Sequence, residues 1–233
     1  MKKLADYAAF TGPLAVVVTL LGWLIAGLLP VPFGPGDQDE IARFFLEDPT
    51  RVKIGFLVAA VGVVLMIPQL ALISLHLGRM EPSGIPLLAV IQIAAAAVTV
   101  LINMFPQMIF ALAAFRADRD PSDVVLLCDV AFLLLFCGIA PFIVQNVAVG
   151  IAILRDPAAL MPRWVAFVNF FVAVSFLVDP LAYFFKSGPF AWNGIFVFWL
   201  ALTTYCAFLF VMSWACLRAN RSLGVASETP APA

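Results

Sequence analysis

Apolar residues in this chain gather into long runs separated by short polar segments. A helix needs about 20 mostly apolar residues to cross the hydrocarbon core of a bilayer. Six runs meet that requirement, at residues 12–30, 54–78, 84–115, 123–153, 163–186 and 191–218. The pattern predicts an all-α fold, a polytopic transmembrane bundle of six helices in a single domain over residues 1–218. A disordered C-terminal tail is expected over residues 219–233.

The polar segment between the first two runs carries a helical pattern of its own. Asp37 is expected to cap a helix, with Glu40 three residues later closing a capping box. Ile41, Phe44 and Phe45 then fall on one face. The spacing predicts a short amphipathic helix in an outer loop. Such a helix either packs its apolar face on the bundle or in the headgroups, or forms a lid.

The composition agrees with a lipid environment. Of the 233 residues, 64% are hydrophobic and 12% are charged, whereas soluble domains are about 45–50% apolar and about 25% charged. Membrane lipids are therefore the expected surroundings. The net charge of −1 gives no field that would attract nucleic acid, so we expect no nucleic-acid partner.

An even number of spans places both termini on the same side of the membrane. If that side is the cytoplasm, the inner segments carry Lys2, Lys3, Arg79, Arg155, Arg163, Arg218 and Arg221. The outer segments then carry Arg43, Arg51, Lys53, Arg116, Arg119 and Lys186. The two sets are nearly equal in number, so the positive-inside rule decides little. Lys2 and Lys3 precede the first span, and we expect cytoplasmic termini on that ground.

Small residues and prolines predict how the helices pack. Gly55, Ala59 and Gly62 share one face of the second span, where the lack of large side chains lets helices approach closely in lipid. Prolines interrupt four spans, at Pro68, Pro106, Pro141 and Pro180. Each proline frees a carbonyl about one turn earlier, which needs a partner from a neighbouring helix or from a water-filled cavity.

Polar side chains at membrane depth are the candidates for function, because burying them is costly. Asp179, Tyr183 and Lys186 fall on one helix face, and Gln107 follows Asn103 by one turn. The ligand-binding candidates are Asp129, Asp179, Asn103, Gln107, Lys186, Tyr183, Gln69 and Asn169. Together with Gln92, His76, Gln145 and Asn146, these residues favour a polar or hydrated interior over a dry bundle.

Structural roles compete with these assignments. Asp179 precedes a proline, and such a pair is typical of a helix cap. Asp129 lies two turns into its span, where it could pair with Arg116 or Arg119. The amides are typical of residues that join helices through hydrogen bonds.

Several kinds of chemistry are excluded by what the sequence lacks. A single histidine rules out bis-histidine haem within one chain and histidine-rich di-iron sites. There is no HExxH motif, no phosphate-binding P-loop and no GxSxG elbow. The four cysteines lie in apolar runs without a CxxC pair, which is typical of small buried residues. We expect no metal and no cofactor.

Short motifs, mostly in the second half of the chain, are similar to those of a known group. They are Ala114 to Arg116 (AFR), Ala152 to Asp156 (AILRD), Pro162 to Trp164 (PRW) and Phe184 to Gly194 (FFKSGPFAWNG). With them the chain resembles a group of uncharacterised six-span bacterial integral membrane proteins. The resemblance covers most of the chain and implies a bacterial inner membrane, but no activity. By its residues alone, the last motif predicts a turn and an interfacial belt formed by Phe184, Phe185, Phe190 and Trp192.

Three functions remain open. The first is a bundle that binds or transports a small, largely apolar molecule, with the polar candidates orienting its polar end. The second is a structural or accessory subunit that packs against another membrane protein or a second copy of itself. The third is a membrane enzyme that uses Asp129 and Asp179 as an acid–base pair, which requires both carboxylates to face one cavity. The lack of catalytic motifs favours the two non-enzymatic functions.

Overall fold

The computed structural model describes residues 2–81 and 84–228, and within them every regular element is helical. The elements are α1 (Lys2–Ala26), α2 (Gln38–Glu47), α3 (Pro49–Val64), α4 (Ile67–Met80), α5 (Leu87–Ala113), α6 (Pro121–Cys137), α7 (Ala140–Arg155), α8 (Arg163–Ser175), the 3-10 helix η1 (Phe176–Tyr183), the π-helix η2 (Ile195–Trp199) and α9 (Leu200–Glu228). They combine into six spans long and apolar enough to cross a membrane. The predicted all-α bundle of six spans is confirmed.

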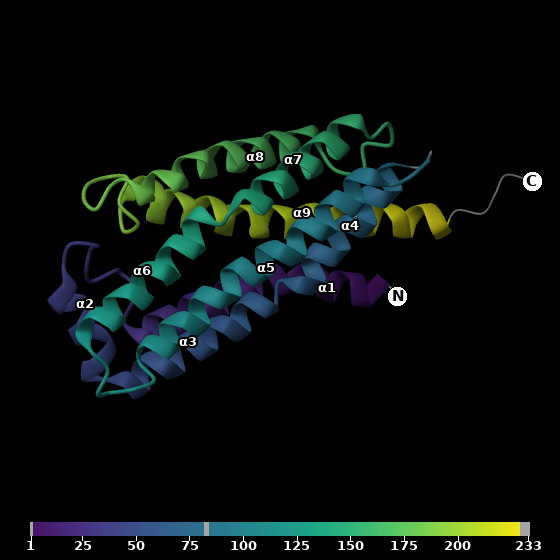
Figure 1. Cartoon of the computed structure of the whole chain (residues 1–233). Coiled ribbons are helices and arrows are strands. Elements are labelled where there is room, and N and C mark those ends of the chain that lie inside the picture. The colour runs from purple at the N-terminus through teal and green to yellow at the C-terminus, as the bar shows by residue number, and fades with distance from the viewer. Residues whose placement is uncertain (1, 82–83, 229–233) are drawn as a thin grey trace, which may run out of the picture.

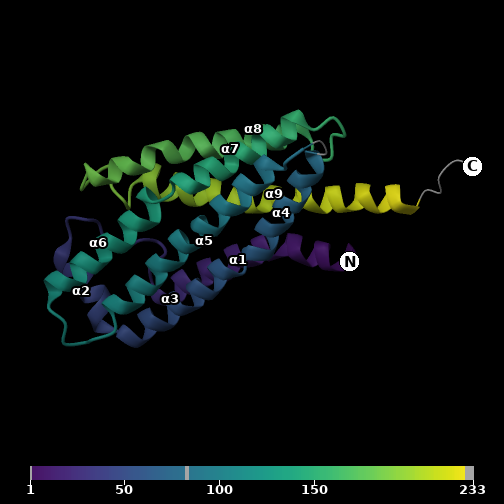
Figure 2. The same ribbon diagram turned by 45° about the vertical axis from the view of Figure 1, so that its right-hand side comes forward.

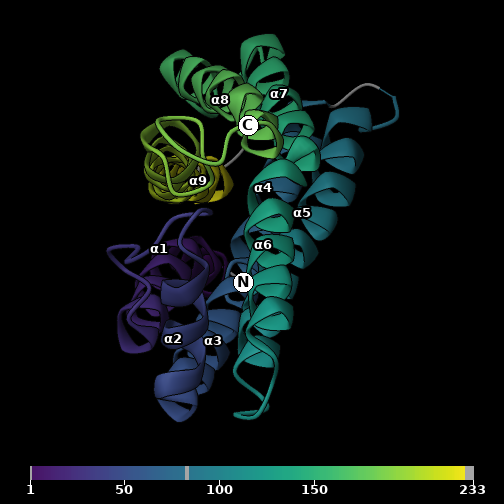
Figure 3. The ribbon, with the colours of Figure 1, turned by 60° about the vertical axis from the view of Figure 1, so that its left-hand side comes forward.

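The helices lie roughly along one long axis, and the start of α1 and the end of α9 lie at the same end of the bundle, here called the terminal end (Figure 1, Figure 2). The opposite end carries α2 and is called the α2 end. Seen obliquely from the α2 end, α1 lies between α3 and α9, and α7 and α8 lie on the other side of α9 from α1 (Figure 3). The two ends of the chain therefore share a side, as an even number of spans requires.

The last helix is longer than the sequence predicted. The expected disordered tail began at residue 219, but α9 continues to Glu228, so the prediction is wrong for residues 219–228. Residues 229–233 lie outside the described part. The physical reason is packing against α1: Ala219 is fully buried, and Asn220 Nδ2 donates to Asp6 Oδ1 at 2.9 Å.

Helices α1 and α3 approach so closely that their backbones touch. A Cβ atom added at Gly55 would lie 2.4 Å from the backbone nitrogen of Ala26, and one added at Gly22 would lie 2.4 Å from that of Ala59. At Gly62 an added Cβ would lie 2.4 Å from Thr19 Oγ1. The small-residue face predicted on the second span is confirmed as a packing face.

Three of the four predicted proline interruptions are confirmed. The second span breaks between α3 and α4 just before Pro68, and the fourth breaks between α6 and α7 just before Pro141. Pro180 lies within η1, where the fifth span tightens into a 3-10 helix. Pro106 does not interrupt its span, since α5 runs without a break from Leu87 to Ala113.

The predicted amphipathic helix is α2, and its apolar face is packed on α6 and α3. Ile41 and Phe45 are fully buried, which supports the packed helix over the lid. The predicted capping box is wrong. The Asp37 side chain makes no cap bond to the helix and instead accepts a hydrogen bond from the Gly34 backbone N–H at 2.9 Å.

An aromatic cluster fills the α2 end of the bundle. Trp192 stacks on Phe132 with ring centroids 3.9 Å apart and an interplanar angle of 8°. The cluster continues through Phe110, Phe56 and Phe45, whose neighbouring rings are also in contact. The predicted aromatic belt is therefore wrong for Trp192, which is 2% exposed. Burial of its ring instead anchors the loop between η1 and η2 to the bundle.

Candidate ligand cavity

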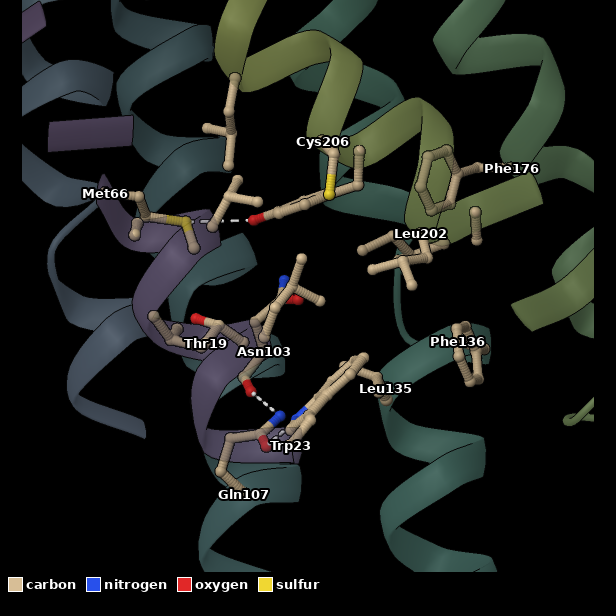
Figure 4. Close-up of a pocket in the computed structure, with 18 residues that line it drawn as sticks. Thr19, Trp23, Met66, Asn103, Gln107, Leu135, Phe136, Phe176, Leu202 and Cys206 are labelled. Carbon is tan, nitrogen blue, oxygen red and sulfur yellow. Dashed lines mark hydrogen bonds between the residues drawn. The ribbon is translucent and has the colours of Figure 1, made fainter. Parts of the chain in front are cut away.

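A cavity of about 70 Å³ lies inside the bundle, between α1, α5 and α9 (Figure 4). A single water needs about 10–15 Å³ measured in the same way, so the space is large enough for several waters or a small molecule. Its lining residues are Ala15, Val16, Thr19, Leu20, Trp23, Val63, Met66, Asn103, Gln107, Leu135, Phe136, Ile139, Phe176, Ala201, Leu202, Tyr205, Cys206 and Leu209.

Three of these residues lie at breaks within spans. Met66 lies between α3 and α4, and Ile139 lies between α6 and α7. Phe176 is the first residue of η1, where the α-helix of the fifth span tightens into a 3-10 helix. Non-helical backbone at membrane depth is tolerated where it is buried in protein or lines a cavity. The breaks of three spans therefore all border this cavity.

The lining is apolar with a few neutral polar groups. Among the described lining residues there is no acidic or basic side chain. Trp23 Nε1 donates to Gln107 Oε1 at 2.8 Å, which ties α1 to α5. Gln107 Nε2 in turn donates to the Asn103 carbonyl at 3.2 Å. These bonds occupy the indole and the Gln107 amide, so both residues serve mainly to join helices.

Two other polar groups keep hydrogen-bonding capacity for a ligand. Asn103 Nδ2 donates to the Thr99 carbonyl at 2.8 Å, while nothing among the described residues donates to its Oδ1. The Tyr205 hydroxyl donates only to the Met66 sulfur at 3.1 Å, and a thioether is a weak acceptor. The cavity therefore offers one free amide acceptor and one weakly engaged hydroxyl.

The structure brings two of the eight predicted site residues, Asn103 and Gln107, into the cavity lining. Gln69 lies just behind the wall, with Nε2 donating to the carbonyl of the lining residue Leu209 at 2.7 Å. Asn169 lies farther along α8, where Nδ2 donates to the Val165 carbonyl at 2.8 Å. Tyr183 is 62% exposed on η1. The predicted common face of Asp179, Tyr183 and Lys186 is wrong. Residues 176–183 form a 3-10 helix with three residues per turn, in which Asp179 is fully buried while Tyr183 is exposed.

Asp129 and Lys186 lie near each other outside the cavity. Asp129 is half-buried on α6 and faces the side chain of Trp192 and the charge of Lys186. The alternative pairing with Arg116 or Arg119 is wrong, because the ion pairs within 4.0 Å among the described residues are Arg43–Glu40 and Arg51–Asp48. The neighbours that act on Asp129 are instead Trp192 and Lys186, which both belong to the loop after η1.

Asp179 is fully buried, and neither of its carboxyl oxygens has a partner among the described residues. The predicted helix cap is wrong, because Asp179 lies inside η1. With three residues per turn, Phe176 and Asp179 share one face of this 3-10 helix. Asp179 therefore lies one turn beyond the cavity wall, on the side toward the α2 end. Neither it nor Asp129 lines the cavity, so the geometry that an acid–base pair requires is not met there.

Substitution of Asp179 tests whether its buried carboxyl group stabilises or destabilises the fold. We expect Asp179→Leu to raise the unfolding temperature in detergent, because it removes a buried polar group whose unmet hydrogen bonds cost about 1–3 kcal/mol. The matched control Asp123→Leu changes an exposed carboxylate at the start of α6 and is expected to have little effect. A lower unfolding temperature for Asp179→Leu would show that the carboxyl group stabilises the fold.

Sequence reasoning missed four polar residues of the cavity: Thr19, Trp23, Tyr205 and Cys206. A signal was available for Trp23 and Tyr205, because a buried indole N–H or phenol needs a hydrogen-bond partner. Further unpartnered polar atoms lie buried at Gln145, Asn146 and His76. The expectation of a polar interior therefore holds for the described residues, over a wider region than the cavity.

The six apolar helices are consistent with a multi-pass membrane protein. No family model, no curated protein and no solved structure matches this chain.

Proposed function

We propose that the protein binds a small, neutral, largely apolar molecule in the cavity and serves as a membrane transporter or binding protein for it. The observation that supports this proposal is that the breaks of three spans, at Met66, Ile139 and Phe176, all border one cavity. In transporters, discontinuous helices of this kind form the substrate site near the middle of the bilayer and allow the halves of the bundle to move.

The lining supports the chemical class of the ligand. A charged ligand would need a partner of opposite charge in so apolar a site, and the described lining offers none. Asn103 Oδ1 can accept a hydrogen bond, and the Tyr205 hydroxyl can donate or accept one. These groups suit a molecule with an apolar body and one small polar group, such as a hydroxyl.

The proposal includes an orientation. We place the protein in a bacterial inner membrane with the terminal end in the cytoplasm. Lys2 and Lys3 precede the first span, and cations flanking the first span favour the cytoplasmic side.

The test is to fill the cavity. We expect Ala201→Leu to lower the amount of small molecule that co-purifies with the protein at least about tenfold, the equivalent of 1.4 kcal/mol of binding free energy, because the larger side chain enters the cavity. The control Ala97→Leu adds the same atoms at an exposed site on α5 and is expected to change nothing. The measurement is native mass spectrometry from detergent, with solvent extraction to identify the bound molecule.

A second variant keeps the proposal testable if Ala201→Leu fails to fold. Asn103→Val removes the free amide acceptor without adding bulk, and it is expected to weaken binding while leaving the unfolding temperature close to that of the natural protein. Equal occupancy in Ala201→Leu and the natural protein would contradict the proposal. A second protein at fixed ratio, with no bound small molecule, would point instead to an accessory subunit.

A further inference from the structure

A second hollow lies on an exposed face of α9, farther toward the terminal end than the cavity. Its volume is about 440 Å³, and it is lined by Trp214, Leu217, Arg218, Arg221 and Ser222. These residues recur at helical spacing, so they form one exposed stripe of α9. The hollow thus combines an aromatic ring, two guanidinium groups and a hydroxyl.

The neighbouring helix fixes the level of this hollow in the membrane. Trp214 contacts Trp164, with ring centroids 5.2 Å apart. Trp164 is the second residue of α8, which begins at Arg163 after the loop of residues 156–162. In Figure 2, α9 continues past the other helices at this end. The tryptophan pair therefore marks the end of the apolar spans, where tryptophan and arginine are typical of the headgroup region.

Among the residues whose side chains the structure describes, 3–81 and 84–223, neither arginine at the hollow lies within 4.0 Å of a carboxylate. The ion pairs within 4.0 Å among the described residues are both at the α2 end. Arg218 and Arg221 are exposed, and the Arg218 guanidinium lies over the Trp214 ring at 5.9 Å from its centroid. Stacking of this kind orients the planar fork that binds phosphate with two parallel hydrogen bonds. Within residues 3–81 and 84–223, no carboxylate competes with an anion for the donors of the two guanidinium groups.

Apolar surface extends from the hollow toward the middle of the membrane. Phe210 lies one turn before Trp214 on α9, and Phe167 lies one turn after Trp164 on α8. Phe210 and Phe167 are 49% and 61% exposed. The arginines lie at the headgroup level, and the exposed aromatic residues lie at the depth of the acyl chains. This order matches that of an anionic phospholipid, which has a charged headgroup followed by apolar chains.

We propose that this hollow binds the phosphate headgroup of an anionic phospholipid, with its acyl chains along the exposed aromatic residues of α8 and α9. Basic pockets beside membrane helices bind such headgroups by charge. The site is separate from the cavity and does not depend on the ligand proposed there.

The test compares two lipids on the natural protein and on paired variants. In native mass spectrometry from detergent, phosphatidylglycerol is expected to bind more tightly than phosphatidylcholine. The double variant Arg218→Gln with Arg221→Gln is expected to lose at least about tenfold in phosphatidylglycerol affinity, because it removes both positive charges that attract the phosphate. The control Arg116→Gln with Arg119→Gln removes the same charge at the same spacing from the α2 end and is expected to retain binding.

Two further measurements show whether the planar guanidinium groups and the acyl chains of the lipid both contribute to the affinity. Arg218→Lys with Arg221→Lys is expected to recover only part of the affinity, because lysine lacks the planar fork. Inorganic phosphate is expected to compete poorly, since it lacks the acyl chains. Equal affinity for the two lipids, full binding by the double glutamine variant, or binding of inorganic phosphate as tight as that of the lipid would each overturn the proposal.

Discussion

Gly55→Leu is expected to abolish the folded bundle. At Gly55 even a Cβ atom would lie 2.4 Å from the Ala26 nitrogen and 2.6 Å from the Gly22 carbonyl oxygen. Both neighbours are backbone atoms, so the contact can be relieved only by separating α1 from α3. Overpacking by one methyl group costs about 1–3 kcal/mol, and a leucine adds three more carbons. We expect aggregation, or loss of the monodisperse peak in size-exclusion chromatography.

The matched control is Gly78→Ala on α4. An added Cβ there would meet Ala89 at 3.9 Å, an ordinary contact. Because alanine favours a helix over glycine by about 1 kcal/mol, this variant is expected to keep or raise the unfolding temperature. Gly55→Ala should fall between the two. A Gly55→Leu protein as stable as the natural one would show that α1 and α3 do not pack through this glycine.

Trp192→Ala is expected to lower the free energy of unfolding by about 3–5 kcal/mol, the typical cost of deleting a buried large aromatic side chain. The ring is 2% exposed and lies flat on Phe132, with the Phe33 ring centroid 5.9 Å away. Its removal would leave a cavity that the surrounding aromatic rings cannot close. Unfolding in detergent by increasing denaturant, followed by circular dichroism, measures the change.

Two comparisons make this prediction specific. Phe184→Ala alters a side chain in the same loop that is 79% exposed, and a change within about 0.5 kcal/mol is expected. Trp192→Phe keeps much of the stacking on Phe132 and is expected to lose less than the alanine variant. If Trp192→Ala and Phe184→Ala proved equally mild, the loop between η1 and η2 would not be anchored by Trp192.

Length and composition determined the spans, because crossing a bilayer requires a minimum apolar length that can be counted along the chain. The packing face at Gly55 and the helix breaks near Pro68 and Pro141 were also predictable, since both follow from local geometry. Pro106 shows the limit of this reasoning. Proline weakens a helix, but whether the helix breaks depends on the helices packed around it.

Only the tertiary structure shows which residues line the candidate cavity. Periodicity fixes which residues share a face of one helix, and it correctly grouped Asn103 with Gln107. It does not say which helices are neighbours, so it could not bring Tyr205 and Trp23 to the same space or turn Asp129 away from it. Asp179 was misjudged for the same reason: its sequence context is that of a cap, and its burial is set by contacts with α6 and η2. The apolar pattern alone determined a six-helix membrane bundle, and the contacts between helices decided where that bundle is hollow.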